Sequence, residues 1–151
     1  MLSPAAQAPV LASRSRGHRL GALALAIASL AVLVVGASLQ PDRAGHGTHT
    51  QLGLPPCGWA VLLGYPCPTC GMTTAVCLAA HARPLEAFAT QPAGALIAVL
   101  LAATFWVCLY IAATGSSLGE RMLGLLTVRS LWWIAGAGLA AWAYKIAVWP
   151  G

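Results

Sequence analysis

The chain has 151 residues and a formal net charge of +5; 59% of its residues are hydrophobic and only 7% are charged. Because a soluble domain carries about 25% charged residues, most of this chain is expected to have lipid rather than water as its solvent. Disorder over most of the length is excluded, since disorder needs low hydrophobicity and high charge. Nucleic-acid binding is not expected either, because the basic residues are scattered rather than clustered.

Residues 20–39 form the first apolar run, which contains no charged residue. As a helix rising about 1.5 Å per residue, the run would be about 30 Å long, which matches the hydrocarbon core of a bilayer. We therefore expect a transmembrane helix over 19–40, preceded by a basic, disordered tail over 1–18. The alternative is a cleaved signal peptide, because arginines precede the run and small residues stand near its end.

Two further apolar runs follow later in the chain, at 92–114 and 131–149, and a loop over 115–130 joins them. Each is long enough to span a membrane, and in lipid a span must satisfy its own backbone hydrogen bonds. Both are therefore predicted to be transmembrane helices. Tryptophans stand at both ends of the third run, where the headgroups favour them. Lys145, near its end, is expected to extend toward the same headgroups.

The middle segment, residues 57–91, begins with a long uncharged stretch but contains residues that break helices. These residues are Gly64, Pro66, Pro68 and Gly71. We expect two short pieces, residues 56–63 and a helix from about Pro68 to Ala82, which lie at the interface or re-enter the membrane. A crossing at this point is the alternative, and the positive charges do not decide between the two topologies. Both place the N-terminus in the cytoplasm and residues 41–56 outside.

The chain contains five cysteines, and the notable pair is Cys67-Pro-Thr-Cys70. A C-x-x-C motif brings two sulfurs within reach of one bond or one metal ion. With Cys67 as the N-cap of a helix that begins at Pro68, the helix dipole would favour a Cys67 thiolate and hence thiol–disulfide exchange. A structural disulfide, a metal site, and a tight turn with small apolar fillers are the alternatives.

A second candidate metal-binding motif precedes this pair. His46 and His49 form an H-x-x-H in the loop after the first span. Together with Cys67 and Cys70 they would make a His₂Cys₂ set, which zinc accepts. Solvated histidines in a flexible loop are the alternative interpretation.

A stripe of weakly polar residues lies on one face of the expected helix after the motif. Its members are Cys70, Thr74, Cys77 and His81. One interpretation is a lined cavity in which His81 titrates near neutral pH. The other, which we favour, is contact between helices, with Thr74 bonded back to its own helix.

The segment Cys57–Ala75, followed by Leu85–Pro92, resembles a family of small bacterial membrane proteins catalogued as domain of unknown function 2752. The family pattern is a leading Cys, then Gly-x-Pro-Cys-Pro-x-Cys-Gly-x-Thr-Arg-Ala, a short helix, Asn-Pro and a long apolar helix. The matching positions are Cys57, Gly64, Pro66, Cys67, Pro68, Cys70, Gly71, Thr73 and Ala75. The loop before Cys57 resembles that of planctomycete-type members. Thr74 replaces the family's Arg, and Gln91 replaces the Asn before Pro92.

The resemblance implies a membrane location but no reaction. Acidic residues are absent from the expected spans, which disfavours an ion-coupled transporter, and no phosphate-binding loop supports nucleotide binding. The sequence therefore predicts an all-α, multi-pass protein of the bacterial inner membrane, with about three spans; it assigns no biochemical role, and a non-enzymatic one is favoured. Its expected partners are the bilayer and either another membrane protein or a second copy. The alternatives are a thiol–disulfide oxidoreductase acting through Cys67 and Cys70, and a metal-binding module, with zinc as the ion.

Overall fold

The computed structural model describes residues 8–116 and 127–149, with side chains from residue 16 onward, and these ranges contain helices and no β-strand. The predicted all-helical class is confirmed for this part of the chain. Residues 1–7 of the expected tail and 117–126 of the expected second loop lie outside the described residues.

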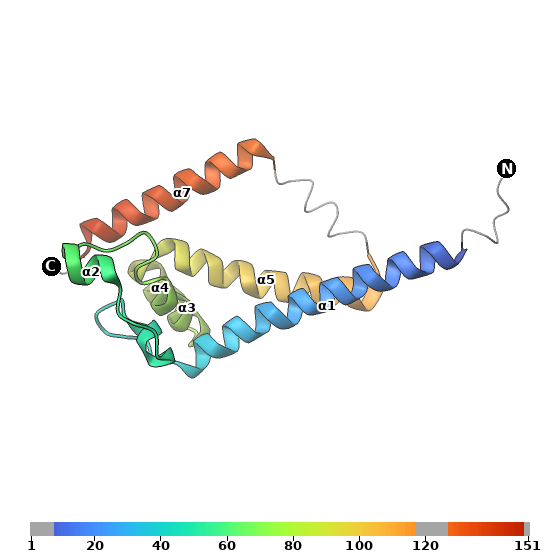
Figure 1. Cartoon of the computed structure of the whole chain (residues 1–151), viewed down its shortest axis with the longest axis horizontal. Helices are drawn as coiled ribbons and strands as arrows, with labels where there is room; N and C mark the ends of the chain where they lie inside the picture. The colour runs from blue at the N-terminus through green and yellow to red at the C-terminus, as the bar shows by residue number, and fades with distance from the viewer. Residues whose placement is uncertain (1–7, 117–126, 150–151) are drawn as a thin grey trace.

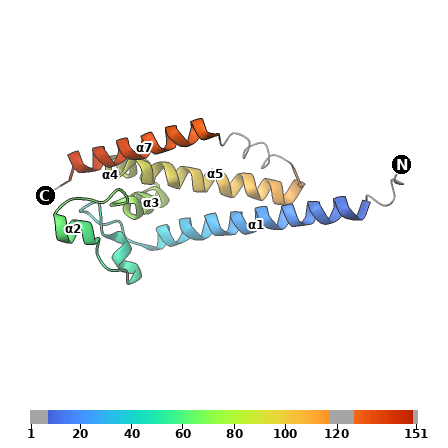
Figure 2. The ribbon, with the colours of Figure 1, turned by 45° about the horizontal axis from the view of Figure 1, so that its top comes forward.

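Two long apolar helices, α1 (Ala8–Ser38) and α5 (Pro92–Thr114), pack side by side and run in opposite directions (Figures 1 and 2). The stretch Arg16–Ser38 and the whole of α5 are long and apolar enough to cross a membrane. This supports the first two predicted spans. Helix α1 begins at Ala8, inside the tail expected to be disordered. Pro9 suits the first turn of a helix, and adding residues to an existing helix needs no new nucleus.

The third long helix, α7 (Val128–Ala147), begins with a capping box. The Ser130 backbone N–H donates to Thr127 Oγ1 at 3.3 Å, and the Thr127 N–H donates to Ser130 Oγ at 2.9 Å. Helix α7 is not among the helices that are apolar enough to cross a membrane, since its lysine, arginine and aromatic residues lower its hydropathy. A third span therefore stays a prediction. Residues 131–140 are all exposed, and only the last turns of α7 contact the rest of the chain closely.

Four short elements gather at one end of the molecule, where α1 ends and α5 begins (Figure 1). They are η2 (Thr48–Leu52), α2 (Gly58–Leu63), α3 (Met72–Ala80) and α4 (Pro84–Thr90). The last three belong to residues 57–91, which we call the cysteine module. As the prolines and glycines predicted, the segment from residue 57 to residue 82 is not a single helix.

Small residues let the cysteine module pack closely against the long helices. The buried core of this region consists of Ala75, Leu78, Ala87 and Ala95. A Cβ added to Gly94 at the start of α5 would lie 2.9 Å from the Cβ of Ala75, so the two helices approach almost to backbone contact. Two buried hydroxyls, of Thr48 and Thr74, hydrogen-bond at 2.8 Å and join the loop before the module to α3.

Candidate metal centre

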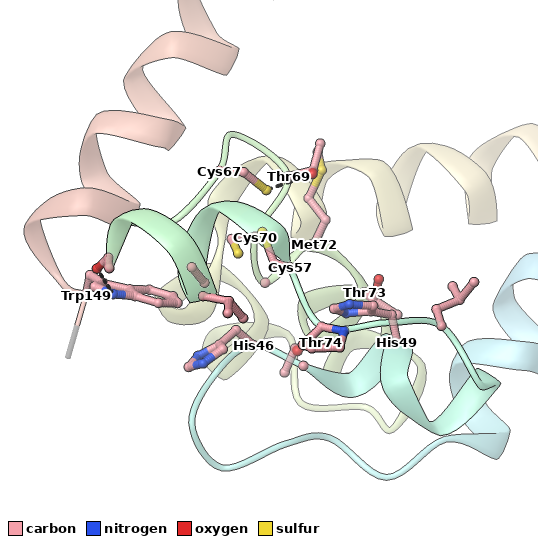
Figure 3. Close-up of a pocket in the computed structure, with 17 residues that line it drawn as sticks. His46, His49, Cys57, Cys67, Thr69, Cys70, Met72, Thr73, Thr74 and Trp149 are labelled. Atoms are coloured by element: carbon pink, nitrogen blue, oxygen red, sulfur yellow. Dashed lines mark hydrogen bonds between the residues drawn. The ribbon is translucent and has the colours of Figure 1, made fainter. Parts of the chain in front are cut away.

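Three cysteine sulfurs lie together in the cysteine module. The Sγ atoms of Cys57, Cys67 and Cys70 are within 4.8 Å of one another, and all three residues are free thiols. They come from the start of α2 and from the loop between α2 and α3 (Figure 3). The sequence predicted the Cys67–Cys70 pair, whereas Cys57 stood out only as a motif residue of the family. The structure adds it as a third member of the cluster.

Cys57 is the N-cap residue of α2, and this position affects its thiol. The pKa of Cys57 is lowered to about 7, chiefly by the backbone N–H of Ala60 and also by the thiols of Cys67 and Cys70, against the opposing effect of burial. Unpaired N–H groups of a first helical turn favour an anion for the same reason. The lowered pKa expected of a cysteine at a helix start therefore belongs to Cys57.

Cys67 is not an N-cap, so that prediction is wrong. Residues 68–71 form a turn, in which the Cys70 N–H donates to the Cys67 carbonyl at 3.0 Å. Helix α3 begins only at Met72, after Gly71 has taken a left-handed conformation at φ 86°. A Cβ at Gly71 would lie 2.7 Å from the Gly45 carbonyl oxygen, so both its space and its φ require glycine. The turn, rather than a helix terminus, holds Cys67 and Cys70 together.

Cys70 has the opposite environment to Cys57. Its side chain is buried, and this burial raises the pKa of Cys70 to about 12 although the Cys67 backbone opposes the shift. Cys67 is more exposed, and its Sγ lies 3.2 Å from the Thr69 hydroxyl. The cluster thus combines an easily ionised thiol with a protonated one, which is an arrangement that a bound cation or an exchange reaction can use.

His46 and His49 line the same cavity as the three cysteines, a space of about 800 Å³. Neither imidazole belongs to the group of sulfurs, so the predicted His₂Cys₂ set is not assembled. Both imidazoles nevertheless line the cavity that holds the sulfurs (Figure 3). Each ring has one nitrogen engaged by a backbone carbonyl. His46 Nδ1 lies 2.9 Å from the Ala44 oxygen, and His49 Nε2 lies 3.1 Å from the Pro55 oxygen. The other ring nitrogen can then carry a lone pair.

The predicted polar stripe on α3 divides between two surroundings. Cys70 and Thr74 line the cavity, although the Thr74 hydroxyl bonds to Thr48 rather than back to its own helix. Cys77 is fully buried and donates to the Leu39 carbonyl at the end of α1 at 3.1 Å, which fits contact between helices. His81 is exposed at the end of α3, where its Nδ1 lies 2.9 Å from the Cys77 oxygen.

Two tryptophans, Trp142 in the last turns of α7 and Trp149 just after its end, bond to the loop that precedes Cys67. Trp149 Nε1 donates to the Gly64 carbonyl and Trp142 Nε1 to the Pro66 carbonyl, each at 3.0 Å. Lys145 lies between these tryptophans in the sequence and is buried. It does not extend to the headgroups as expected. The regular spacing of these residues along one helix face was the signal in the sequence that could have indicated a docking face.

Gln91 is a further site residue that the sequence did not indicate. It is fully buried, and its Nε2 donates to the Pro68 carbonyl at 3.3 Å. Its Oε1 accepts the Ala93 N–H at 3.4 Å, so the same side chain caps α5. Gln91 therefore caps the N-terminus of α5, a role for which the asparagine of the family pattern is also suited.

The cysteine module and the first part of α5 match a known protein family. Residues 57–105 match the family model described as Protein of unknown function (DUF2752). The resemblance to this family is thereby confirmed, and all three clustered cysteines lie inside the matched region, whereas the likeness of the preceding loop to planctomycete-type members stays a prediction. His46, His49 and α7 lie outside it. No curated protein and no solved structure matches the chain.

Proposed function

We propose that this chain is a membrane protein whose cysteine module binds a thiophilic metal ion through Cys57, Cys67 and Cys70. The observation that carries the proposal is the grouping of three sulfurs within 4.8 Å of one another. Zinc–thiolate bonds of about 2.3 Å in a tetrahedral site place the sulfurs about 3.8 Å apart, so small rotations of these side chains are sufficient. Zn²⁺ and Cu⁺ are the ions that favour such a thiolate-rich site.

A fourth ligand is available in the same cavity. His46 and His49 each have one ring nitrogen bonded to a backbone carbonyl, which is the arrangement that orients a metal-ligating histidine. The proposed set is therefore three cysteines with one imidazole or a water. It differs from the set proposed from the sequence, because Cys57 takes the place of a histidine.

The proposed location of the module is the outer surface of a bacterial inner membrane. Helices α1 and α5 would form two spans and α7 a third, with the N-terminus in the cytoplasm. All the short elements of the module gather where α1 ends and α5 begins, which supports one module on one side of the bilayer (Figure 2). The exposed residues 131–140 of α7 would face lipid, another membrane protein or a second copy.

Metal analysis of the full chain, purified in mild detergent under reducing conditions, tests the proposal. We expect about one zinc or copper ion per chain, and its loss in Cys57→Ser, Cys67→Ser and Cys70→Ser. Cys108→Ser is the matched control, since Cys108 is a buried cysteine of α5 outside the cluster. A protein that binds neither ion, or binds one equally well without the three cysteines, would contradict the proposal.

Thiol–disulfide exchange through Cys67 and Cys70 is a second candidate, favoured by the turn that holds these two free thiols together. In this reaction Cys67 and Cys70 would form a disulfide while the disulfide of a partner protein is reduced to two thiols. Trapping thiols with an alkylating reagent in intact cells separates the candidates. A Cys67–Cys70 disulfide that exchanges with added glutathione would favour exchange, whereas three thiols protected by metal would favour binding.

A further inference from the structure

Lys145 is a buried ammonium group whose contacts are all uncharged. Its side chain is 3% exposed. Nζ donates to the Gly45 carbonyl at 3.1 Å and to the Thr90 carbonyl at 3.2 Å, and it lies 5.7 Å from the centre of the Trp149 ring. A buried charge costs several kcal/mol unless an opposite charge or a metal complex compensates it.

No carboxylate supplies that opposite charge within the part of the chain that the structure describes. The ion pair found there joins Arg83 to Glu86 on the exposed surface of α4, and no acidic side chain lies within ion-pair distance of Lys145. The backbone hydrogen bonds satisfy the donors of Lys145 but leave its charge uncompensated. Among the described residues, any compensating anion is therefore a group other than a carboxylate.

The cysteine cluster is the nearby group that can become anionic. Nζ lies 3.2 Å from the point where a Cβ of Gly71 would stand, so Lys145 touches the backbone directly after Cys70. Lys145 therefore lies beside Cys70, the buried member of the cluster. Because Lys145 comes from α7, this charge reaches the cluster from outside the cysteine module.

We propose that Lys145 is the built-in counter-charge of the metal–thiolate complex, an inference that rests on the proposed function. Three thiolates leave a net charge of −1 with a divalent ion and −2 with a monovalent ion. Lys145 stabilises either complex, and it stabilises the more negative complex more strongly. The site is thus built to hold a thiophilic cation as an anionic complex, with Cu⁺ more dependent on Lys145 than Zn²⁺.

Metal competition on the reduced full chain in detergent tests this dependence, with one chromogenic chelator for Zn²⁺ and another for Cu⁺, at a single pH. Lys145→Gln keeps N–H donors for the two carbonyls but removes the charge. We expect its affinity for Zn²⁺ to fall about tenfold and that for Cu⁺ about a hundredfold, since each net charge interacts across a partly buried medium. Lys145→Arg is expected to restore most of both losses. Tyr144→Phe is the matched control: it removes a neutral donor from α7 to the Ala89 carbonyl and should change neither affinity.

The pattern of losses distinguishes a charge effect from a structural one. Equal losses for the two ions, or losses that Lys145→Arg does not restore, would overturn the role of Lys145 while leaving cysteine-dependent binding intact. Unchanged affinities in Lys145→Gln would overturn it as well. Binding of neither ion by the unmodified chain would instead reject the proposed function itself. Should Lys145→Gln fail to give a monodisperse protein, Lys145→Met tests the same difference between the ions.

Discussion

The paired helices α1 and α5 and the cysteine module are stabilised in different ways. The two long helices pack along extended apolar faces, with many similar side chains and few polar contacts. The module depends on individual bonds and close approaches, such as the turn at Gly71 and the Thr48–Thr74 pair. Many interchangeable contacts tolerate substitution better than a few specific ones. We therefore expect substitutions to reduce stability more in the cysteine module, which also holds the three clustered thiols, than in the paired helices.

Gly71→Ala is expected to have the largest effect. The added Cβ would clash with the Gly45 carbonyl oxygen, and the φ of residue 71 is positive. We therefore expect the free energy of unfolding, measured in detergent, to fall by about 3 kcal/mol. Gly64→Ala, with positive φ but open space, should lose about 1–2 kcal/mol. Gly21→Ala in α1 meets no neighbour and should be neutral or stabilising. Equal effects at the three positions would remove the contrast between the regions.

The reactivity of Cys57 sharpens the contrast inside the module. Because the Ala60 N–H lowers its pKa to about 7, half of the thiol is ionised near neutral pH. We expect alkylation of the metal-free protein at pH 7 about tenfold faster than that of an ordinary thiol, with a rate that rises through pH 7 and then levels off. Cys57→Ser should abolish this fast phase and Cys108→Ser should preserve it. A rate that still rises steeply above pH 9 would contradict the assignment.

The buried hydroxyl pair gives a smaller effect on stability. Thr74→Val keeps the shape of the side chain but removes the bond to Thr48, so we expect a loss of about 1 kcal/mol. A double-mutant cycle with Thr48→Val isolates the pair. The two losses should not add, because the same bond is lost in each single variant. Strictly additive losses would show that the hydroxyls act independently.

Among the variants of the cysteine module, the smallest loss of stability is expected for Cys67→Ser/Cys70→Ser. In the metal-free, reduced protein the pair forms no bond that closes a loop, so the variant should still insert and should lose less than about 1 kcal/mol. Membrane fractionation and thermal unfolding in detergent measure both properties. If the double variant fails to accumulate while Cys108→Ser is harmless, the pair maintains the fold, and the exchange reaction loses its main support.

Local sequence predicted those features of the molecule that depend on neighbouring residues. The uncharged runs indicated α1 and α5, and the prolines and glycines after residue 63 indicated the break between α2 and α3. The start of α3 was misplaced, because Pro68 suits the first turn of a helix as well as a turn. Only the hydrogen bond from Cys70 to Cys67 and the positive φ of Gly71 decide for the turn.

The sequence by itself determined that the chain is helical and rich in apolar segments, and that Cys67 and Cys70 lie close together, since these properties follow from periodicity and short spacing. Tertiary structure alone decided that Cys57 joins them and that Lys145 is buried beside the cluster. Both depend on how α2 folds back and how α7 docks, and a spacing along one helix does not say which distant segment that helix contacts. A lysine near the end of an apolar helix is compatible with lipid headgroups or with a buried position, and only the docking of α7 decides for the buried position beside the cysteines.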